Sequence, residues 1–213
     1  MILTICLVSM DLNNIKSDIL VVDYTEYCKS TPYDTTPSRG VCFIENPDER
    51  LGAFCILNPN HVSYKAINLE ETKTLVTDNA GNSVKQCECI CEAYRRAGRR
   101  WILLLELKYC KEENISSNML EALDKLEKCY DFLNNEKDFF KSNLYRVYLC
   151  ASHPEHETIE PFGRFICNQD KLLRLKDKGL IFIYKNAIKI HTPEYITGVD
   201  TPYKYKRLSN NMS

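Results

Sequence analysis

The pattern of apolar and polar positions divides the chain into short segments. Two apolar runs, VCFIE at 41–45 and GAFCILN at 52–58, flank the turn-like NPDER and predict short buried strands. Residues 84–94, VKQCECICEAY, alternate as a strand does, and 101–110, WILLLELKYC, are the most hydrophobic segment. The basic turn RRAGRR at 95–100 lies between them, so the sequence predicts an antiparallel hairpin.

Helical spacing follows this hairpin. Apolar residues recur at intervals of three and four between residues 118 and 134, which predicts an amphipathic helix. Asn118, with Glu121 three residues later, marks the expected start of that helix. Its apolar positions are Met119, Leu120, Leu123, Leu126, Tyr130 and Leu133.

The remaining segments complete a predicted α/β fold. LYRVYLCAS at 144–152 predicts a strand, 170–179 the end of a helix that Gly179 stops, and 180–190 a hairpin with its turn at Asn186. The chain after this hairpin is polar and contains prolines, so we expect a tail. The order strand, strand, helix, strand predicts a central mixed β-sheet flanked by helices, in one domain over residues 1–213.

Composition narrows the classes of function. Of 213 residues, 44% are hydrophobic and 27% are charged, which is enough to bury a core. The formal net charge of −1 argues against nucleic-acid binding through bulk charge but leaves a local basic surface open. The N-terminal MILTICLVSM has no basic n-region and no small-residue cleavage site, and no run approaches the ~20 apolar residues of a membrane span. We therefore expect neither a signal peptide nor a membrane partner, and both Met1 and Met10 are candidate starts.

The eleven cysteines are an odd number, and many lie inside apolar runs. This favours reduced, buried thiols in a cytoplasmic protein over a disulfide framework. Cys87, Cys89 and Cys91 alternate along the 84–94 strand, which places them on one face about 7 Å apart. That spacing is too wide for three ligands of one tetrahedral zinc.

Two charges lie near the end of the most hydrophobic segment. Glu106 and Lys108 share one face of the predicted strand, because side chains two apart point the same way. Both faces are apolar where the strand begins, so we expect it to be buried and its charges to need partners. Glu88 or Glu92 on the preceding strand supplies a second carboxylate, depending on the hairpin register.

Two carboxylates and a lysine at a strand end are a minimal set for phosphodiester hydrolysis. Paired carboxylates form a hard oxygen site that suits Mg²⁺ or Mn²⁺. A bound divalent ion polarises a phosphoryl oxygen and lowers the pKa of an attacking water, while a neighbouring lysine stabilises charge on phosphorus. The structural alternative is a salt bridge between Lys108 and Glu88 or Glu106, without chemistry.

At Glu106-Leu107-Lys108, with the acidic residue of KQCECIC before it, the sequence resembles the PD-(D/E)xK nuclease superfamily. The resemblance covers about residues 60–152 and implies a restriction-endonuclease-like αβββαβ core. It implies that Glu88 and Glu106 are metal ligands, that the Leu107 carbonyl is a further ligand and that Lys108 is the catalytic lysine.

Two positions depart from the pattern of that family. Its first acid is usually aspartate, whereas this chain has Glu88, whose side chain is one methylene longer. Many members carry a glutamine in the following helix, where this chain offers Asp124 and Lys125.

Two further clusters are candidates for function. The turn YRRAGRRW places Arg95, Arg96, Arg99 and Arg100 where they would hold a nucleic-acid backbone near the expected site, although charge runs are usually solvated turns. SHPEHE at 152–157 gathers two histidines and two glutamates after a strand, as a second metal or acid–base site or as a polar loop.

Together these residues predict a metal-dependent nuclease that acts on DNA in preference to RNA, with Mg²⁺ or Mn²⁺ as cofactor. The alternative is a non-catalytic α/β module of the same fold that binds a partner protein or nucleic acid. The near-neutral charge and Glu88 favour the module, whereas the coincidence of a strand end, paired acids and a lysine favours the enzyme. A homodimer stays open.

Overall fold

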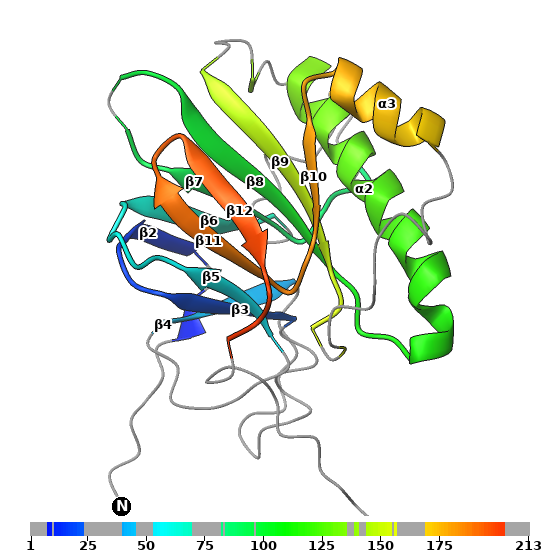
Figure 1. The fold of residues 1–213 in the computed structure, drawn as a ribbon, viewed down its shortest axis with the longest axis horizontal. Coiled ribbons are helices and arrows are strands. Elements are labelled where there is room, and N and C mark those ends of the chain that lie inside the picture. Colours follow the sequence, from blue (N-terminus) through cyan, green and yellow to red (C-terminus); the bar gives the residue numbers. More distant parts are fainter. Residues whose placement is uncertain are drawn as a thin grey trace, which may run out of the picture.

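Two mixed β-sheets packed face to face, with helices on the outer face of one of them, make up the fold (Figure 1). The computed structural model describes residues 8–9, 11–23, 40–45, 53–69, 82, 84–95, 97–135, 139–140, 144–154, 156 and 169–202. Within these ranges the arrangement is of the α/β kind, as the sequence predicts, but the predicted sheet flanked by helices is wrong on one face, which a second sheet covers instead. No helix in them is long and apolar enough to cross a membrane.

Sheet I contains the two strands of the predicted hairpin. Its order is β10, β9, β8, β7, β6 and β2. β8 pairs antiparallel with β7 and parallel with β9, so the predicted hairpin is confirmed. The bounds are β2 Asp11–Ile15, β6 Tyr64–Asn68, β7 Cys89–Ala93, β8 Arg100–Leu107, β9 Tyr145–Ser152 and β10 Ile181–Tyr184.

Sheet II packs against sheet I on the face opposite the helices. Its order is β1, β4, β3, β5, β11 and β12. The predicted strands at 41–45 and 52–58 are β4 and β5 in this sheet. The bounds are β1 Val8–Ser9, β3 Ile19–Asp23, β4 Val41–Glu45, β5 Phe54–Leu57, β11 Ala187–Thr192 and β12 Tyr195–Val199.

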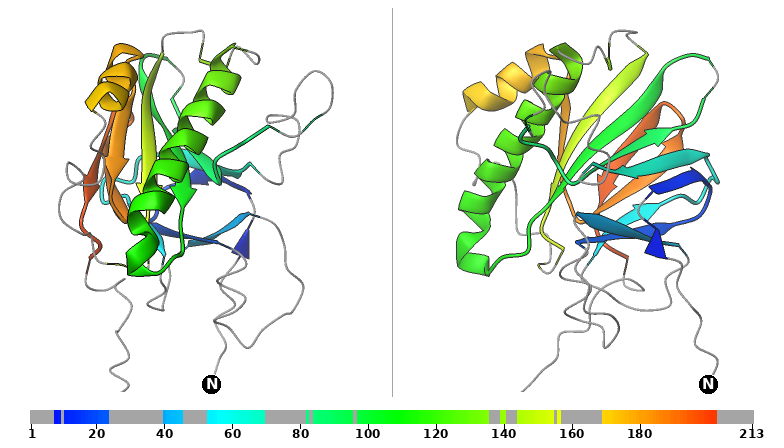
Figure 2. Two further views of the ribbon diagram at one scale, coloured as in Figure 1. Left: turned by 90° about the vertical axis from the view of Figure 1, so that its right-hand side faces the viewer. Right: turned by 180° about the vertical axis from the view of Figure 1, so that it is seen from behind.

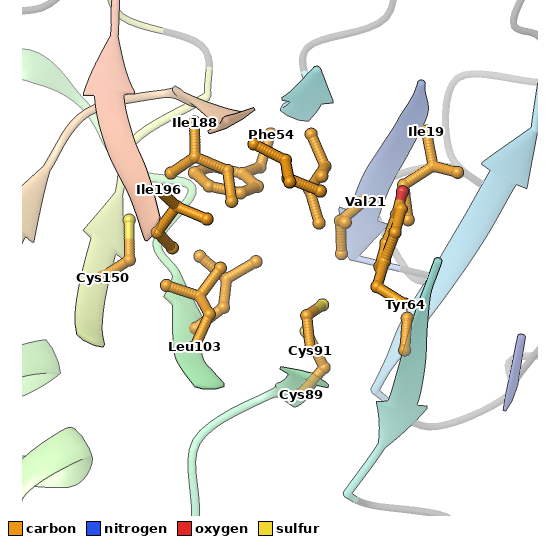
Figure 3. Packing of buried hydrophobic residues seen from close by; sticks show 14 of the residues in the cluster. Ile19, Val21, Phe54, Tyr64, Cys89, Cys91, Leu103, Cys150, Ile188 and Ile196 are labelled. Carbon is orange, nitrogen blue, oxygen red and sulfur yellow. The ribbon is translucent and has the colours of Figure 1, made fainter. Parts of the chain in front are cut away.

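Two cores follow from the alternation of side chains in β8. Leu103 points toward sheet II, into a cluster with residues such as Phe54 and Ile188 (Figure 3). Leu105 belongs to the same cluster. Ile102 and Leu104 point the other way, toward the helices. Because both of its faces are covered by apolar residues, β8 is a central, buried strand, as its composition predicts.

Helices cover the other face of sheet I (Figure 2). A 3₁₀ turn, η1 (Glu112–Asn114), leads into α2 (Ile115–Asn135), and α3 (Gln169–Asp177) lies beside α2. α2 begins three residues before the predicted start, because Ile115 belongs to its buried stripe. The Asn118 side chain donates a 2.8 Å hydrogen bond to the Asn114 carbonyl.

The end of α3 agrees with the prediction. Gly179 has a φ of 72°, in the left-handed region that favours glycine. The Gly179 N–H donates to the Lys176 carbonyl, and the Leu180 N–H to the Leu175 carbonyl. These are the two hydrogen bonds of a Schellman motif, which satisfies the last carbonyls of a helix.

Three local predictions are wrong. Residues 180–190 do not form a hairpin, because β10 joins sheet I beside β9 whereas β11 joins sheet II beside β5. The chain after residue 192 is not a polar tail at first, because β12 pairs antiparallel with β11. Cys87 does not share a face with Cys89 and Cys91, because it precedes the start of β7 and packs on the helix side, 3.6 Å from Cys129.

Candidate functional site

Glu88 and Glu106 lie side by side where β8 ends. Cys89 is opposite Leu105 in the antiparallel pair, and the Glu88 N–H donates a 3.0 Å hydrogen bond to the Leu105 carbonyl. This register leaves Glu88, and not Glu92, beside Glu106, since Glu92 is opposite Ile102. The pairing thus decides between the two acids that the sequence offers.

Two lysines hold the Glu106 carboxylate. Lys125 Nζ lies 2.7 Å from Glu106 Oε1 and 3.9 Å from Glu88 Oε1. Lys108 Nζ lies 3.3 Å from Glu106 Oε1 and 3.4 Å from Glu121 Oε1 on α2. Two carboxylates, one from each strand of the hairpin, therefore share a cation that comes from the helix.

Burial sets the electrostatics of Glu106, whose side chain is 0% exposed. Burial raises the pKa of its carboxyl, and Lys125 and Lys108 oppose that rise. Burial would lower the pKa of Lys125, but Glu106 and Glu88 outweigh it, so the pKa of Lys125 is raised and its ammonium form is stabilised. Glu106 Oε2 is buried and has no hydrogen-bond partner among the described residues. A native protein rarely leaves such an oxygen without water or an ion.

The carbonyl predicted to ligate metal belongs to Leu107, which lies between the two charged residues. Its side chain packs into the core between the sheets. The next residue, Lys108, donates its backbone N–H to the Ser152 carbonyl at 2.9 Å, which fixes the end of β8 against β9. Glu106, Leu107 and Lys108 are thus held by sheet pairing rather than by a loop.

The oxygens of this site fit a hard divalent cation. Two carboxylates and a carbonyl are oxygen donors of the kind that Mg²⁺ takes together with retained waters. The unpartnered Glu106 Oε2 is an oxygen to which such an ion could bind. The fit is partial, because the described residues contain no group of three or more His, Cys, Asp or Glu side chains arranged around one ion. Lys125 Nζ contacts both Glu88 and Glu106 and supplies a positive charge between them.

The arginine turn lies at the other end of the hairpin from this site, so the expectation that it adjoins the site is wrong. Arg100 begins β8 and Glu106 lies six residues on, a separation of about 20 Å at ~3.3 Å per residue. Arg95 forms an ion pair with Glu194, and Arg100 Nε lies 3.2 Å from Glu92 Oε1.

The other two arginines of the turn are Arg96 and Arg99. Arg99 is exposed, and Arg96 is outside the described residues. A turn cannot adjoin both ends of an eight-residue strand, which is why the predicted proximity fails.

Lys125 is the residue whose position in the site the sequence did not predict. The helical spacing could have indicated that Lys125 is buried. Position 125 falls three residues after Ala122 and four before Cys129, on the buried stripe of α2. A charged residue on such a stripe needs a buried partner. The partner is Glu106, which is remote in sequence.

His153 is a second neighbour of the site. It follows Ser152, whose carbonyl accepts from Lys108, and its ring packs edge-on against Tyr184 with centroids 5.7 Å apart. The side chain is buried, and neither ring nitrogen has a hydrogen-bond partner among the described residues. Burial, His156 and Lys108 lower the pKa of His153 to about 4, so the ring is neutral at pH 7.

The structure describes residues 152–154 and 156 of the predicted SHPEHE cluster. His156 contacts the Cys110 carbonyl through Nε2, and its backbone N–H donates to the His153 carbonyl at 3.0 Å. Glu155 and Glu157 are outside the described residues. The part that can be described is a turn fixed by hydrogen bonds.

Comparison with known proteins gives no match to a family model, to a curated protein or to a solved structure.

Proposed function

We propose that this protein hydrolyses phosphodiester bonds of nucleic acid, DNA in preference to RNA, with a divalent metal ion at Glu88 and Glu106. The observation that carries the proposal is the convergence of two carboxylates from paired strands, with Lys108 Nζ 3.3 Å from Glu106. The sequence provides a Glu-x-Lys at a strand end, and the hairpin register places the second acid beside it.

The order of elements around the site supports the proposal. β6, β7 and β8 are successive antiparallel strands, α2 follows, and β9 returns parallel to β8. This βββαβ order agrees with the PD-(D/E)xK resemblance after its first helix. The described residues before β6 contain strands and no helix.

Each side chain has a role that follows from its position. When bound, Mg²⁺ or Mn²⁺ would polarise a phosphoryl oxygen and acidify a water. Glu88, Glu106 and the Leu107 carbonyl would hold the ion. Lys108 would donate hydrogen bonds to the attacking water and stabilise negative charge that develops on the phosphoryl oxygens.

A second candidate is a non-catalytic nucleic-acid or protein-binding module. The position of Lys125 between Glu88 and Glu106 favours it, because that ammonium already compensates the two carboxylates. In this case the charged cluster is a structural ion-pair network beneath α2.

Incubation of the full chain with supercoiled plasmid and Mg²⁺ or Mn²⁺ tests the proposal. We expect nicking or linearisation by the wild type and its loss in Lys108→Ala and Glu106→Gln. Lys128→Ala is the matched control, because Lys128 is an exposed lysine of α2 that pairs with Asp124. Equal cleavage by all four proteins, or no cleavage by folded wild type, would favour the non-catalytic candidate.

A further inference from the structure

An open pocket of about 660 Å³ lies on sheet I, away from the acid pair. Its walls come from the edge strand β2, from β6, and from the ends of β7 and β8 that meet at the arginine turn. The residues that matter to its chemistry are Asn13, Asn14, Lys65, Glu92, Tyr94 and Arg100. We name it the Lys65 pocket.

A bulge in β2 shapes one wall of the Lys65 pocket. The pairing of β2 with β6 shifts register between Leu12 and Ile15, so Asn13 and Asn14 together lie opposite the single residue Lys65. Asn14 has a φ of 58°, a left-handed conformation uncommon for residues other than glycine. Bulges re-aim side chains and often lie beside functional sites, and here the bulge places two amide residues on the pocket.

Ion pairs fix the opposite wall. Glu92 is buried, with Lys65 Nζ and Arg100 Nε each 3.2 Å from its carboxylate. Tyr145 donates its hydroxyl to Glu92 Oε1 at 3.2 Å, and the Arg100 guanidinium lies 4.7 Å from the centre of the Tyr145 ring. Arg100 and Glu92 are therefore held rigidly, whereas the Lys65 side chain is 35% exposed.

Tyr94 gives the pocket an aromatic surface. It is 63% exposed, the largest exposed fraction among the large hydrophobic side chains of the described residues. Three cations, Lys65, Arg95 and Arg100, line the pocket with Tyr94, and they pair with the carboxylates of Glu92 and Glu194. The pocket thus combines excess positive charge, an open ring face, and amide and carboxylate groups that can pair with a base edge.

We propose that the Lys65 pocket binds one nucleotide of a single-stranded nucleic-acid segment, with the base on Tyr94 and the phosphate on Lys65. Its volume lies within the ~300–1,000 Å³ of small-ligand sites. Proteins that hold single strands combine cationic grooves with exposed aromatic rings in this way. An acidic peptide would use the cations but would leave the exposed ring of Tyr94 without a base to stack on it.

The location of the pocket links it to the acid pair. Glu92 lies in β7 and Glu88 directly before it, both facing the helices, about 13 Å apart at ~3.3 Å per residue. The straight path between them crosses Ile90, which is buried in the cluster beneath α2, so a strand seated in the pocket must pass around this cluster to reach Glu88. That the pocket is a substrate subsite of the nuclease rests on the proposed function. That it binds a nucleotide does not.

The test measures the affinity of the full chain for a fluorescein-labelled oligothymidylate 12-mer by anisotropy, in EDTA so that no cleavage occurs. We expect Tyr94→Ala to weaken binding about tenfold, as loss of one base stack does. Lys65→Ala should weaken binding and reduce the slope of log affinity against log salt by about one phosphate contact. Lys185→Ala is the matched control, because Lys185 is equally exposed and pairs with Asp200 at 2.8 Å, in the segment between β10 and β11.

Three outcomes overturn the inference. The first is that folded wild type does not bind the oligonucleotide. The second is that wild type, Tyr94→Ala and Lys185→Ala bind it with equal affinity. The third is that polyglutamate competes equally strongly, which would make the pocket an acidic-peptide site. The two assays separate the two proposals, because plasmid cleavage tests the acid pair whereas oligonucleotide affinity in EDTA tests the pocket. Binding that depends on Tyr94 without any cleavage would support nucleotide binding and reject the nuclease.

Discussion

Lys125 Nζ lies 2.7 Å from Glu106 Oε1, so the helix that follows β8 supplies a cation to the carboxylate at the end of that strand. The two residues are 19 positions apart in sequence, and the carboxylate is wholly buried. A buried carboxylate is costly unless it is paired, and Lys125 is its nearest partner. The same contact can stabilise the fold and compete with a metal ion, and these two effects can be measured separately.

We predict that Lys125→Met destabilises the protein by about 2–3 kcal/mol at pH 7, because it leaves Glu106 with Lys108 alone. Urea unfolding followed by circular dichroism measures this. The loss should shrink as the pH falls, because the pKa of Glu106 is raised by burial and rises further without Lys125, so the carboxyl becomes protonated. A double variant, Lys125→Met with Glu106→Gln, should recover much of the stability. A loss of the same size in the double variant would show that Lys125 acts through packing alone.

Lys125→Gln is predicted to strengthen Mn²⁺ binding. It removes the ammonium between Glu88 and Glu106, and it introduces the residue that the resembled family often carries there. We expect Kd to fall on the order of tenfold, about 1.4 kcal/mol, in isothermal titration calorimetry. Adding Glu106→Gln should abolish the gain. An unchanged Kd in Lys125→Gln would contradict competition between the lysine and the metal.

His153 should make stability depend on pH below neutrality. The pKa of its buried ring is lowered to about 4, whereas the unfolded ring has a pKa of about 6.5. The unfolded chain therefore binds the proton first, and we expect a loss of about 3 kcal/mol as the pH falls from 7 to 4. Unfolding free energies across this range should fall less in His153→Gln. His191→Gln is the control, since it leaves His153 in place, and identical pH profiles of wild type and His153→Gln would refute the assignment.

Asn186 is predicted to tie the two sheets together. Its side-chain oxygen accepts hydrogen bonds from Ser152 Oγ at 2.8 Å and from the His153 N–H at 2.9 Å. Its backbone carbonyl accepts from the Cys55 N–H in β5 of sheet II. Asn186→Ala leaves two buried hydrogen-bond donors without an acceptor. It should lower the free energy of unfolding, measured by chemical denaturation, by about 2–3 kcal/mol.

Asn60→Ala is the control for that experiment, because Asn60 is exposed and its side chain makes one hydrogen bond in the described part of the chain, 2.8 Å to the His191 carbonyl. We expect its cost to stay below about 1 kcal/mol. If both variants lose the same stability, Asn186 has no special role at the junction of the sheets.

The sequence by itself determined the local elements that burial dictates. The apolar run of β8, the alternation of β7, the helical spacing of α2 and the glycine that ends α3 each correspond to the structure, because these patterns depend on neighbours in the chain. It also placed Glu106 and Lys108 on one face, since that follows from the geometry of a strand.

Only the tertiary structure decided which distant groups meet. The hairpin register chose Glu88 over Glu92, and the crossing of α2 brought Lys125 between the acids. The sequence could not predict that residues 180–190 divide between two sheets, because strands of both sheets have the same local pattern. Pairing partners are set by the packing of whole faces, which a single segment does not encode.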